Sequence, residues 1–194
     1  MDVESNGLSL VPEVEAFKKE VMSSPVLRMS IDKGIANIPE GGILHGSNID
    51  EVFRLVSSVC SEPPRFEDKK LVGLPFIAIF TDLMNNKDGQ MFFLHPKVNE
   101  HLKEVFQVYA NMLESPASLK YLNEEEPHGW LSPQSEKYID WEDYYVDKTQ
   151  AHWGFKTWND FFTRKVRPER RPIDQRPNCI VHSSDSHPLF YPLP

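Results

Sequence analysis

The segment PKVNEHLKEVFQVYANML, residues 96–113, settles the fold class of this chain. Its apolar residues recur at intervals of three and four, which places them on one side of an α-helix. They are Val98, Leu102, Val105, Phe106, Tyr109 and Leu113. Ser115-Pro116 ends the pattern. A long helix with one apolar side has to bury that side against other elements, so the segment predicts a packed helical unit.

Helices are also predicted upstream of this segment. Residues 10–22 show the same amphipathic spacing, and residues 25–33 favour a short second helix. Residues 49–60 favour a third helix, with Ser47 or Asn48 as its N-cap. Together these segments predict an all-α, bundle-like unit with short connections.

Residues 69–86 form the most apolar of the predicted helices. This helix has little polar surface, so we expect it at the centre of the unit. Asn-Asn-Lys-Asp-Gly at residues 85–89 is interpreted as its stop signal, with Gly89 in a left-handed C-cap. Residues 71–80 are too few to cross a bilayer and include Pro75, so they predict a buried helix rather than a membrane span.

The character of the sequence changes after residue 129. All four tryptophans lie beyond that point with three tyrosines among them: Trp130, Trp141, Trp153, Trp158, Tyr138, Tyr144 and Tyr145. Such a cluster is typical of packing between a helical layer and a neighbouring domain, although it also suits a wall that faces a substrate. We expect it to be partly exposed in this chain. Thr157 and Asp160 resemble a capping box at the start of a short helix over residues 158–166.

The last part of the chain, residues 167–194, holds six of the 16 prolines. Proline removes a backbone donor and excludes helix here, while residues 179–181 suit a single strand without a partner. The sequence therefore predicts a mainly α fold, with a helical domain over residues 8–166 and a Pro-rich extended tail over residues 167–194. We expect this tail to begin a β-rich catalytic domain that is missing from the chain.

The amino-acid composition limits the partners and the cellular location that we expect. The formal net charge of −8 over 194 residues argues against a nucleic-acid partner, which usually meets a basic face. The two cysteines, Cys60 and Cys179, have no zinc-site spacing and imply no disulfide framework, so a reducing compartment is expected. The N-terminus has no apolar run of signal-peptide length. We expect a cytoplasmic protein with no transmembrane segment, whose contact with membranes, if any, is peripheral.

Histidines and serines give no further site by spacing alone. His95 and His101 lie six residues apart, which is not the spacing of two metal ligands on one helix face, so no metal site is predicted. A hydrolase triad built from Ser183, His182 and Asp185 is excluded, because neighbouring residues of an extended chain point in alternate directions.

Residues 164–176 carry a run of basic side chains: Arg164, Lys165, Arg167, Arg170, Arg171 and Arg176. One interpretation is contact with lipid phosphate or another anionic surface. The other is structural, in which the run pairs with acidic helices or with the missing domain. Glu169 and Asp174 interrupt the run and arginine suits interfaces, so we favour the structural interpretation.

This basic run belongs to a longer pattern, FKTWNDFFTRKVRPERRPID at residues 155–174. It resembles a motif of the phosphatidylserine decarboxylase family. The residues that match are Trp158, Phe161, Phe162, Arg164, Arg167, Pro168, Arg171, Pro172, Ile173 and Asp174. The order of the upstream helices and the HGWLS phrase at residues 128–132 are similar to the fungal branch that includes tryptophan decarboxylases. The resemblance covers residues 8–186.

The resemblance implies pyruvoyl chemistry. In that family a serine of a Gly-Ser pair attacks its own preceding peptide bond, and the pyruvoyl group so formed makes a Schiff base with the substrate amine. An aspartate follows the Arg-Pro-Ile-Asp phrase, and Asp185 stands there, which makes it the candidate catalytic residue. Ser183 and Ser186 replace the flanking Pro and Gly. The self-cleaving serine and the catalytic histidine are absent, and Gly46-Ser47 lies in the wrong half, where we expect a turn before a helix.

The resemblance therefore implies the N-terminal part of a decarboxylase that acts on phosphatidylserine or an aromatic amino acid, in phospholipid or amine biosynthesis. We expect this chain to be inactive alone and to hold no cofactor of its own. The implied partners are a full-length decarboxylase or a C-terminal catalytic chain, with a small amine or phospholipid substrate only in the complete enzyme. Two alternatives stay open: a non-catalytic module that docks through its tryptophan-rich face, and a truncated reading of a longer gene.

Overall fold

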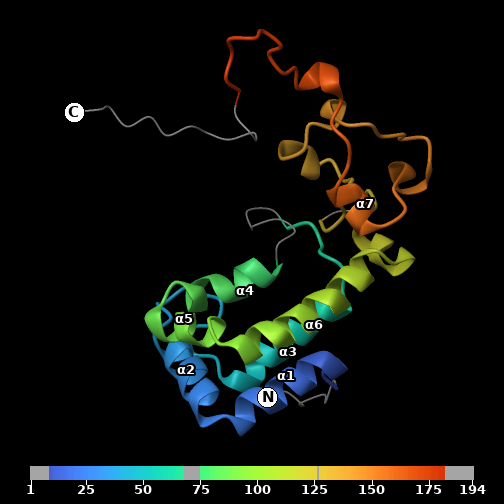
Figure 1. Cartoon of the computed structure of the whole chain (residues 1–194). Coiled ribbons are helices and arrows are strands. Elements are labelled where there is room, and N and C mark those ends of the chain that lie inside the picture. Colours follow the sequence, from blue (N-terminus) through green and yellow to red (C-terminus); the bar gives the residue numbers. More distant parts are fainter. Residues whose placement is uncertain (1–8, 68–74, 126, 182–194) are drawn as a thin grey trace.

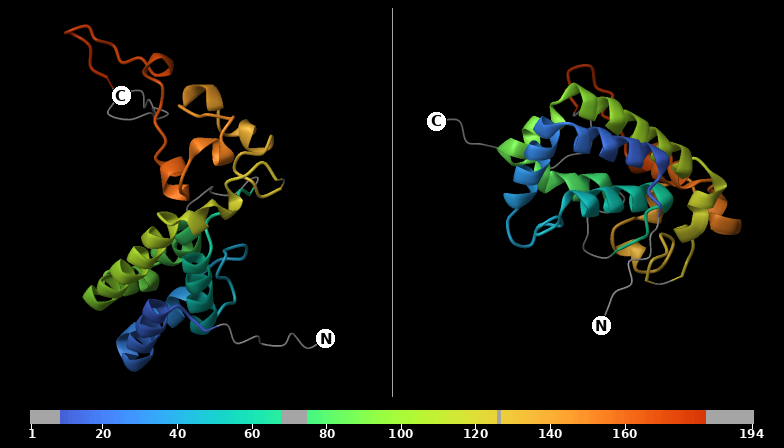
Figure 2. Two further views of the ribbon diagram at one scale, coloured as in Figure 1. Left: turned by 90° about the vertical axis from the view of Figure 1, so that its right-hand side faces the viewer. Right: turned by 90° about the horizontal axis from the view of Figure 1, so that it is seen from below.

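The fold is mainly α in the residues that the computed structural model describes, which are 9–67, 75–125 and 127–181 (Figure 1). Their one β pairing is an isolated antiparallel bridge between Tyr144 and Val166. The predicted fold class is therefore confirmed. The described chain has a layer of α-helices followed by a part made of short helical turns. Figure 2 shows these as two lobes joined at the end of the helix Pro96–Leu113, which is α6.

The first lobe contains helices α1 (Pro12–Ser23), α2 (Pro25–Ala36), α3 (Ile49–Ser61), α4 (Pro75–Met84), α5 (Lys87–Phe93) and α6 (Pro96–Leu113). α6 has the bounds that its apolar spacing predicts. It packs against α1 and α3, while α2 packs against α5. Val98 and Val105 on its apolar side are fully buried. Every helix of the layer adds side chains to the hydrophobic cluster formed there.

Asn48, rather than Ser47, caps α3. The Asn48 side chain accepts a hydrogen bond from the Glu51 backbone N–H at 3.0 Å, and the Glu51 carboxylate accepts one from the Asn48 N–H at 2.9 Å. This reciprocal pair satisfies two backbone donors that a helix start leaves free. The predicted start of the helix is therefore confirmed.

The prediction that residues 69–86 form the central helix is wrong for the part described. Helix α4 begins at Pro75 in the described chain, and residues 69–74 lie outside the described residues. Its Phe76 and Leu83 are buried, but Ile77 and Met84 are half exposed. High apolar content does not by itself place a helix at the centre, because α4 covers the layer from one side only.

The predicted left-handed cap at Gly89 is also wrong, because Gly89 lies inside α5. The Asn86 side chain accepts from the Gly89 N–H at 2.9 Å and so starts a new helix where a stop was predicted. A methyl group on Gly89 would overlap the carbonyl oxygen of Leu83, and a Cβ built on Gly34 of α2 would lie 3.1 Å from the Gly89 Cα. Gly89 is thus required by the close approach of α5 to its neighbours rather than by its own φ angle.

The second lobe is built from short turns: η1 (Pro116–Tyr121), η2 (Ser135–Lys137), η3 (Trp141–Asp143), η4 (Ala151–Gly154), α7 (Trp158–Phe162) and η5 (Pro168–Arg170). α7 is shorter than predicted, since it ends at Phe162. The Thr157 side chain caps it by accepting from the Asp160 N–H at 3.0 Å. The Asp160 carboxylate accepts from the Lys156 N–H instead of closing the box on Thr157.

The four tryptophans form a second hydrophobic cluster, separate from that of the helical layer. All four tryptophans are buried, whereas Tyr138 and Tyr145 are about half exposed, so the prediction that the aromatic cluster is partly exposed holds for its tyrosines and not for its tryptophans. The reason is a segment that follows α3: fully buried Phe66 joins the cluster, and the Pro64 carbonyl accepts from Trp130 Nε1 at 2.7 Å. Pro64 and Phe66, which precede α4, therefore complete a hydrophobic core whose tryptophans all lie after residue 129.

The tail begins with one 3₁₀ turn, η5, where the prolines predicted no helical residues at all. Residues 172–181 have neither helix nor a paired strand, and the single strand without a partner at residues 179–181 stays a prediction. The domain boundary between residues 166 and 167 stays a prediction.

Candidate functional site

Asp185, the predicted catalytic residue, lies outside the described residues. Ser183, Ser186 and the histidine at 182 lie outside them too. The role of Asp185 therefore stays a prediction, and the site must be built from the residues before it.

The Gly46-Ser47 pair forms a turn, as predicted. Gly46 has φ +73°, and the Ser47 N–H donates to the Leu44 carbonyl at 3.1 Å. The nearest histidine in sequence, His45, makes a 2.8 Å hydrogen bond from Nδ1 to the Ile38 carbonyl. A pyruvoyl precursor needs a serine beside a base that activates it, and no hydrogen bond joins Ser47 to His45 or to another base in the described residues, so this turn does not fit that group.

The histidines of α6 have structural positions. His95 caps the helix, since its Nδ1 accepts from the Lys97 N–H at 3.3 Å. His101 stacks on Phe17 of α1 with ring centroids 5.4 Å apart, and its Nδ1 lies 3.3 Å from the Glu104 carboxylate. Among the described residues, no group of three or more His, Cys, Asp or Glu side chains is arranged to hold a metal ion.

The basic run meets an acidic turn over residues 140–143, which sequence reasoning missed. Arg170 donates from Nε to Asp143 at 2.8 Å and from Nη2 to Asp140 at 3.2 Å, and it lies 3.7 Å from Glu142. Arg171 donates to the other oxygen of Asp143 at 3.0 Å. We call these contacts the arginine clasp. Arg170 and Arg171 thus have a structural role, with an acidic turn as the partner in place of the acidic helices or missing domain that we predicted, and the role of the run as a whole stays a prediction.

Arg164 fills the space between α7 and the acidic turn. Its guanidinium carbon lies 4.2 Å from the ring centroid of Tyr144, 4.8 Å from that of Phe161 and 5.6 Å from that of Trp141. Nη1 donates to the Phe161 carbonyl at 3.0 Å. Burial among these rings lowers the pKa of Arg164 from its usual value. The cation is held by ring faces, a use to which planar arginine is better suited than lysine.

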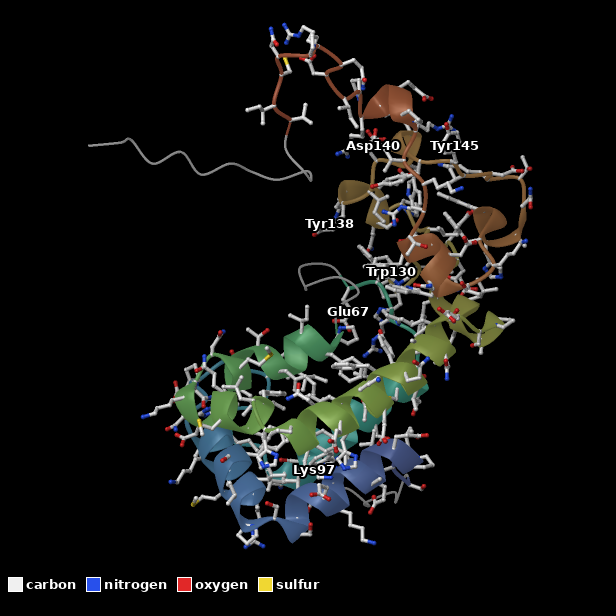
Figure 3. The ribbon with its side chains drawn as sticks, viewed as in Figure 1. Glu67, Lys97, Trp130, Tyr138, Asp140 and Tyr145 are labelled. Carbon is white, nitrogen blue, oxygen red and sulfur yellow. The ribbon has the colours of Figure 1, made fainter. Side chains whose placement is uncertain are left out.

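A short antiparallel ribbon joins the same two segments. The Tyr145 N–H donates to the Lys165 carbonyl at 3.2 Å, and the Arg167 N–H donates to the Asp143 carbonyl at 2.8 Å. The Arg167 side chain adds a bond from Nε to the Tyr144 carbonyl at 2.9 Å. In Figure 3, Asp140 and Tyr145 lie at the end of the lobe next to η5, and Trp130 lies at the end towards the helical layer. The ribbon therefore fixes the place at which the chain leaves the second lobe, which we call the aromatic lobe because it holds the four tryptophans.

The pKa values of the carboxylates that bind these arginines favour the ionised carboxylates. Hydrogen bonds from Arg170 and then Arg171 lower the pKa of Asp143. Further along, hydrogen bonds from Arg176 lower the pKa of Asp174 to about 2. Both carboxylates thus stay ionised at neutral pH and keep their arginine partners.

The sequence signal for this clasp was available. Asp140, Glu142 and Asp143 form an acidic run, and the arginines near residue 170 form a basic one, both between helical turns. Opposite charge in two irregular segments favours their pairing. The arrangement positions the chain that follows α7.

Two hollows lie in the helical layer of the described chain, and they differ in size and lining. One in the core has a volume of about 10 Å³ and is lined only by apolar side chains, which is too little room for a substrate. An open depression of about 420 Å³ lies along one flank of α6, beside Lys103 and Phe106. No helix in the described chain is long and apolar enough to cross a bilayer.

Comparison with known proteins gives the family. A profile of the phosphatidylserine decarboxylase family matches residues 11–139, from α1 to η2. L-tryptophan decarboxylase of Psilocybe cubensis is 27% identical over 187 residues, which cover 88% of this chain and 40% of that protein. Decarboxylase iboD of Amanita muscaria is 29% identical over 140 residues, covering 61% of this chain and 40% of that protein.

A bacterial relative matches a shorter segment. The phosphatidylserine decarboxylase proenzyme of Chlamydia felis is 53% identical over 38 residues, or 20% of this chain and 13% of that protein. The chain spans about two fifths of the length of the two fungal relatives. Because the family profile covers more than half of it, the chain belongs to the phosphatidylserine decarboxylase family.

Proposed function

We propose that this chain is the N-terminal helical part of a pyruvoyl-dependent decarboxylase and that it does not release CO2 by itself. One observation carries the proposal: 88% of the chain matches L-tryptophan decarboxylase, yet the match takes up only 40% of that protein. The chain thus resembles one portion of a larger decarboxylase along most of its own length.

The aromatic amino acids are the substrate class that we favour for the complete enzyme. The two long matches are to fungal decarboxylases, one of them named for L-tryptophan, whereas the match to a phosphatidylserine decarboxylase proenzyme is short. We also propose a cytoplasmic location. A phospholipid substrate, with peripheral contact to a membrane, is the competing proposal.

The helical layer and the aromatic lobe have a supporting function in this proposal. The chemistry requires an activated serine, and the described Gly-Ser turn offers no base to activate it. The arginine clasp and the ribbon instead hold the start of residues 167–181 in a defined place. The candidate catalytic Asp185 follows a few residues further on. We therefore assign the described part the task of positioning the chain that leads to Asp185.

The test is an activity assay on the purified 194-residue chain. L-tryptophan and phosphatidylserine vesicles are supplied separately, CO2 release is measured, and L-tryptophan decarboxylase of Psilocybe cubensis serves as the positive control. Mass spectrometry of the intact chain monitors self-cleavage. We expect no CO2 above background and one uncleaved mass. Decarboxylation by the chain alone, or a pyruvoyl-bearing fragment, contradicts the proposal.

A further inference from the structure

The ribbon between residues 143–145 and 165–167 presents one edge outward. Tyr144 and Val166 are paired by the hydrogen bonds of their neighbours, from Tyr145 to Lys165 and from Arg167 to Asp143. In such an antiparallel pair, the N–H and C=O of the two central residues point away from the partner strand. Val166 therefore directs both of its backbone polar groups out of the ribbon.

The two edges of this ribbon differ. On the Tyr144 side, the N–H donates to the Trp141 carbonyl at 3.2 Å, and the C=O accepts from Arg167 Nε at 2.9 Å, so that edge is closed. On the Val166 side, neither backbone group has a hydrogen-bond partner within the described residues. An unpaired N–H and C=O on an extended segment is a template for another strand.

The open edge is also held rigidly. Arg164 is fixed among the rings of Tyr144, Phe161 and Trp141 just before it, and Arg170 is bound to Asp143 just after it. A segment that is already ordered loses little conformational freedom when a partner binds. This favours recognition by backbone pairing.

The side chains at the edge indicate the chemistry of the partner. Val166 is 39% exposed, and Tyr145 and Phe162 nearby are about half exposed. Lys165 is exposed and has no ion-pair partner in the described chain, and Arg167 carries a second positive charge two residues on. Cross-strand neighbours of opposite charge stabilise a pair. The matching strand has an apolar residue between carboxylates.

A second copy of this chain does not fit the edge. Two copies paired about a two-fold axis at Val166 would set Lys165 of one opposite Arg167 of the other, and like charges directly across a strand pair are destabilising. The partner is therefore a different sequence. The fungal relatives supply one, since about three fifths of their length lies outside the match to this chain.

We propose that the outer edge of residues 165–167 pairs with an extended acidic strand from the remaining part of a longer decarboxylase chain. This inference rests on the proposed function, because it takes its partner from the larger decarboxylase. It names the surface by which the helical part is joined to the rest of the protein.

Binding of an acidic strand tests the edge. In a full-length relative the enzyme's own helical part would already cover that strand, so a synthetic peptide with one valine between two glutamates is immobilised instead, and the full 194-residue chain is titrated over it by biolayer interferometry. Val166→Pro removes the outward N–H, and its control Val166→Thr keeps the N–H and the β-branched shape. Lys165→Glu reverses the charge at the edge, and its control Lys19→Glu makes the same change on an exposed site of α1. Calorimetry checks that each variant is folded.

We expect the native chain to bind, with Val166→Pro and Lys165→Glu each weakening binding about tenfold and both controls staying within about twofold. If Val166→Pro does not fold, Lys165→Glu alone decides. Absence of binding by the native chain, or equal binding by the edge variants and their controls, overturns the proposed edge. Neither result bears on whether the chain releases CO2, so failure of the proposed function is recognised separately in the assay above.

Discussion

Asp143 binds Arg170 and Arg171 with its two carboxylate oxygens, at 2.8 and 3.0 Å. One side chain of the acidic turn thus holds two consecutive arginines that lie 27 and 28 residues further along the chain. The carboxylate is mostly shielded from solvent, whereas both guanidinium groups are partly exposed. The attachment of the tail to the aromatic lobe depends on this residue more than on any other acid of the turn.

Asp143→Asn should loosen the tail. The amide keeps the shape of the side chain but removes the charge that both arginines share, so residues 167–176 should separate from the lobe more often. Trypsin cleavage of the Arg170–Arg171 bond, followed by mass spectrometry, should become about threefold faster. Asp174→Asn is the control, because Asp174 pairs with Arg176 outside the clasp. Equal cleavage of the two variants would show that Asp143 does not hold the tail.

The clasp should weaken in acid. The pKa of Asp143 is lower in the folded chain than in the unfolded one, where a carboxyl of this type has a pKa of about 3.9. Its stabilising effect is therefore present above the unfolded pKa and is lost as the pH falls through the folded pKa. The difference in Tm between the native chain and Asp143→Asn, measured by calorimetry, should be constant from about pH 7 to pH 5 and shrink below about pH 4. A difference that grows in acid would have the wrong sign.

Gly89→Ala should strongly destabilise the helical layer. The added methyl group meets the backbone carbonyl of Leu83, which cannot move without shifting α4. We expect a loss of about 3 kcal/mol in the free energy of unfolding, measured by urea titration with circular dichroism. Gly154→Ala is a matched control: its φ of +87° strains an alanine, but an added Cβ makes only ordinary contacts of 3.8 Å or longer, so the cost is about 1 kcal/mol. Similar losses for both variants would mean that α5 does not approach α4 so closely.

The indole N–H groups of Trp130 and Trp158 should contribute differently to the free energy of unfolding. Trp130 Nε1 donates to the Pro64 carbonyl, whereas Trp158 Nε1 is buried without a hydrogen-bond partner in the described chain. Phenylalanine at either position removes similar volume, but only Trp130→Phe leaves a carbonyl without its donor. Trp130→Phe should cost about 1 kcal/mol more than Trp158→Phe in calorimetric unfolding. The reverse order would contradict the assignment of the Pro64 contact.

The helices were predictable where periodicity and capping agree. In α6 the apolar spacing runs without interruption from a proline start, and its bounds follow directly from the sequence. At residues 85–89 the local signals were ambiguous, because the Asn-rich stretch that ends one helix also starts the next. The side chain of Asn86 caps α5, and a stop signal and a start signal of this kind look the same in one sequence.

The aromatic lobe was less predictable because its contacts are distant in sequence. Burial of the tryptophans depends on Phe66, which lies more than sixty residues before all four of them, and no local pattern indicates that contact. The pairing of the basic run with residues 140–143 was available from charge alone. The candidate Asp185 rests on a resemblance, and its role stays a prediction.

The separation of the two hydrophobic clusters has a spectroscopic consequence. Every indole of the chain belongs to the aromatic lobe, so intrinsic fluorescence reports on that lobe alone, while far-ultraviolet ellipticity comes mostly from the helical layer. Trp141 and Trp153, with ring centroids 4.9 Å apart, are close enough for their excited states to interact. A single denaturation experiment followed by both signals therefore distinguishes one cooperative transition from two.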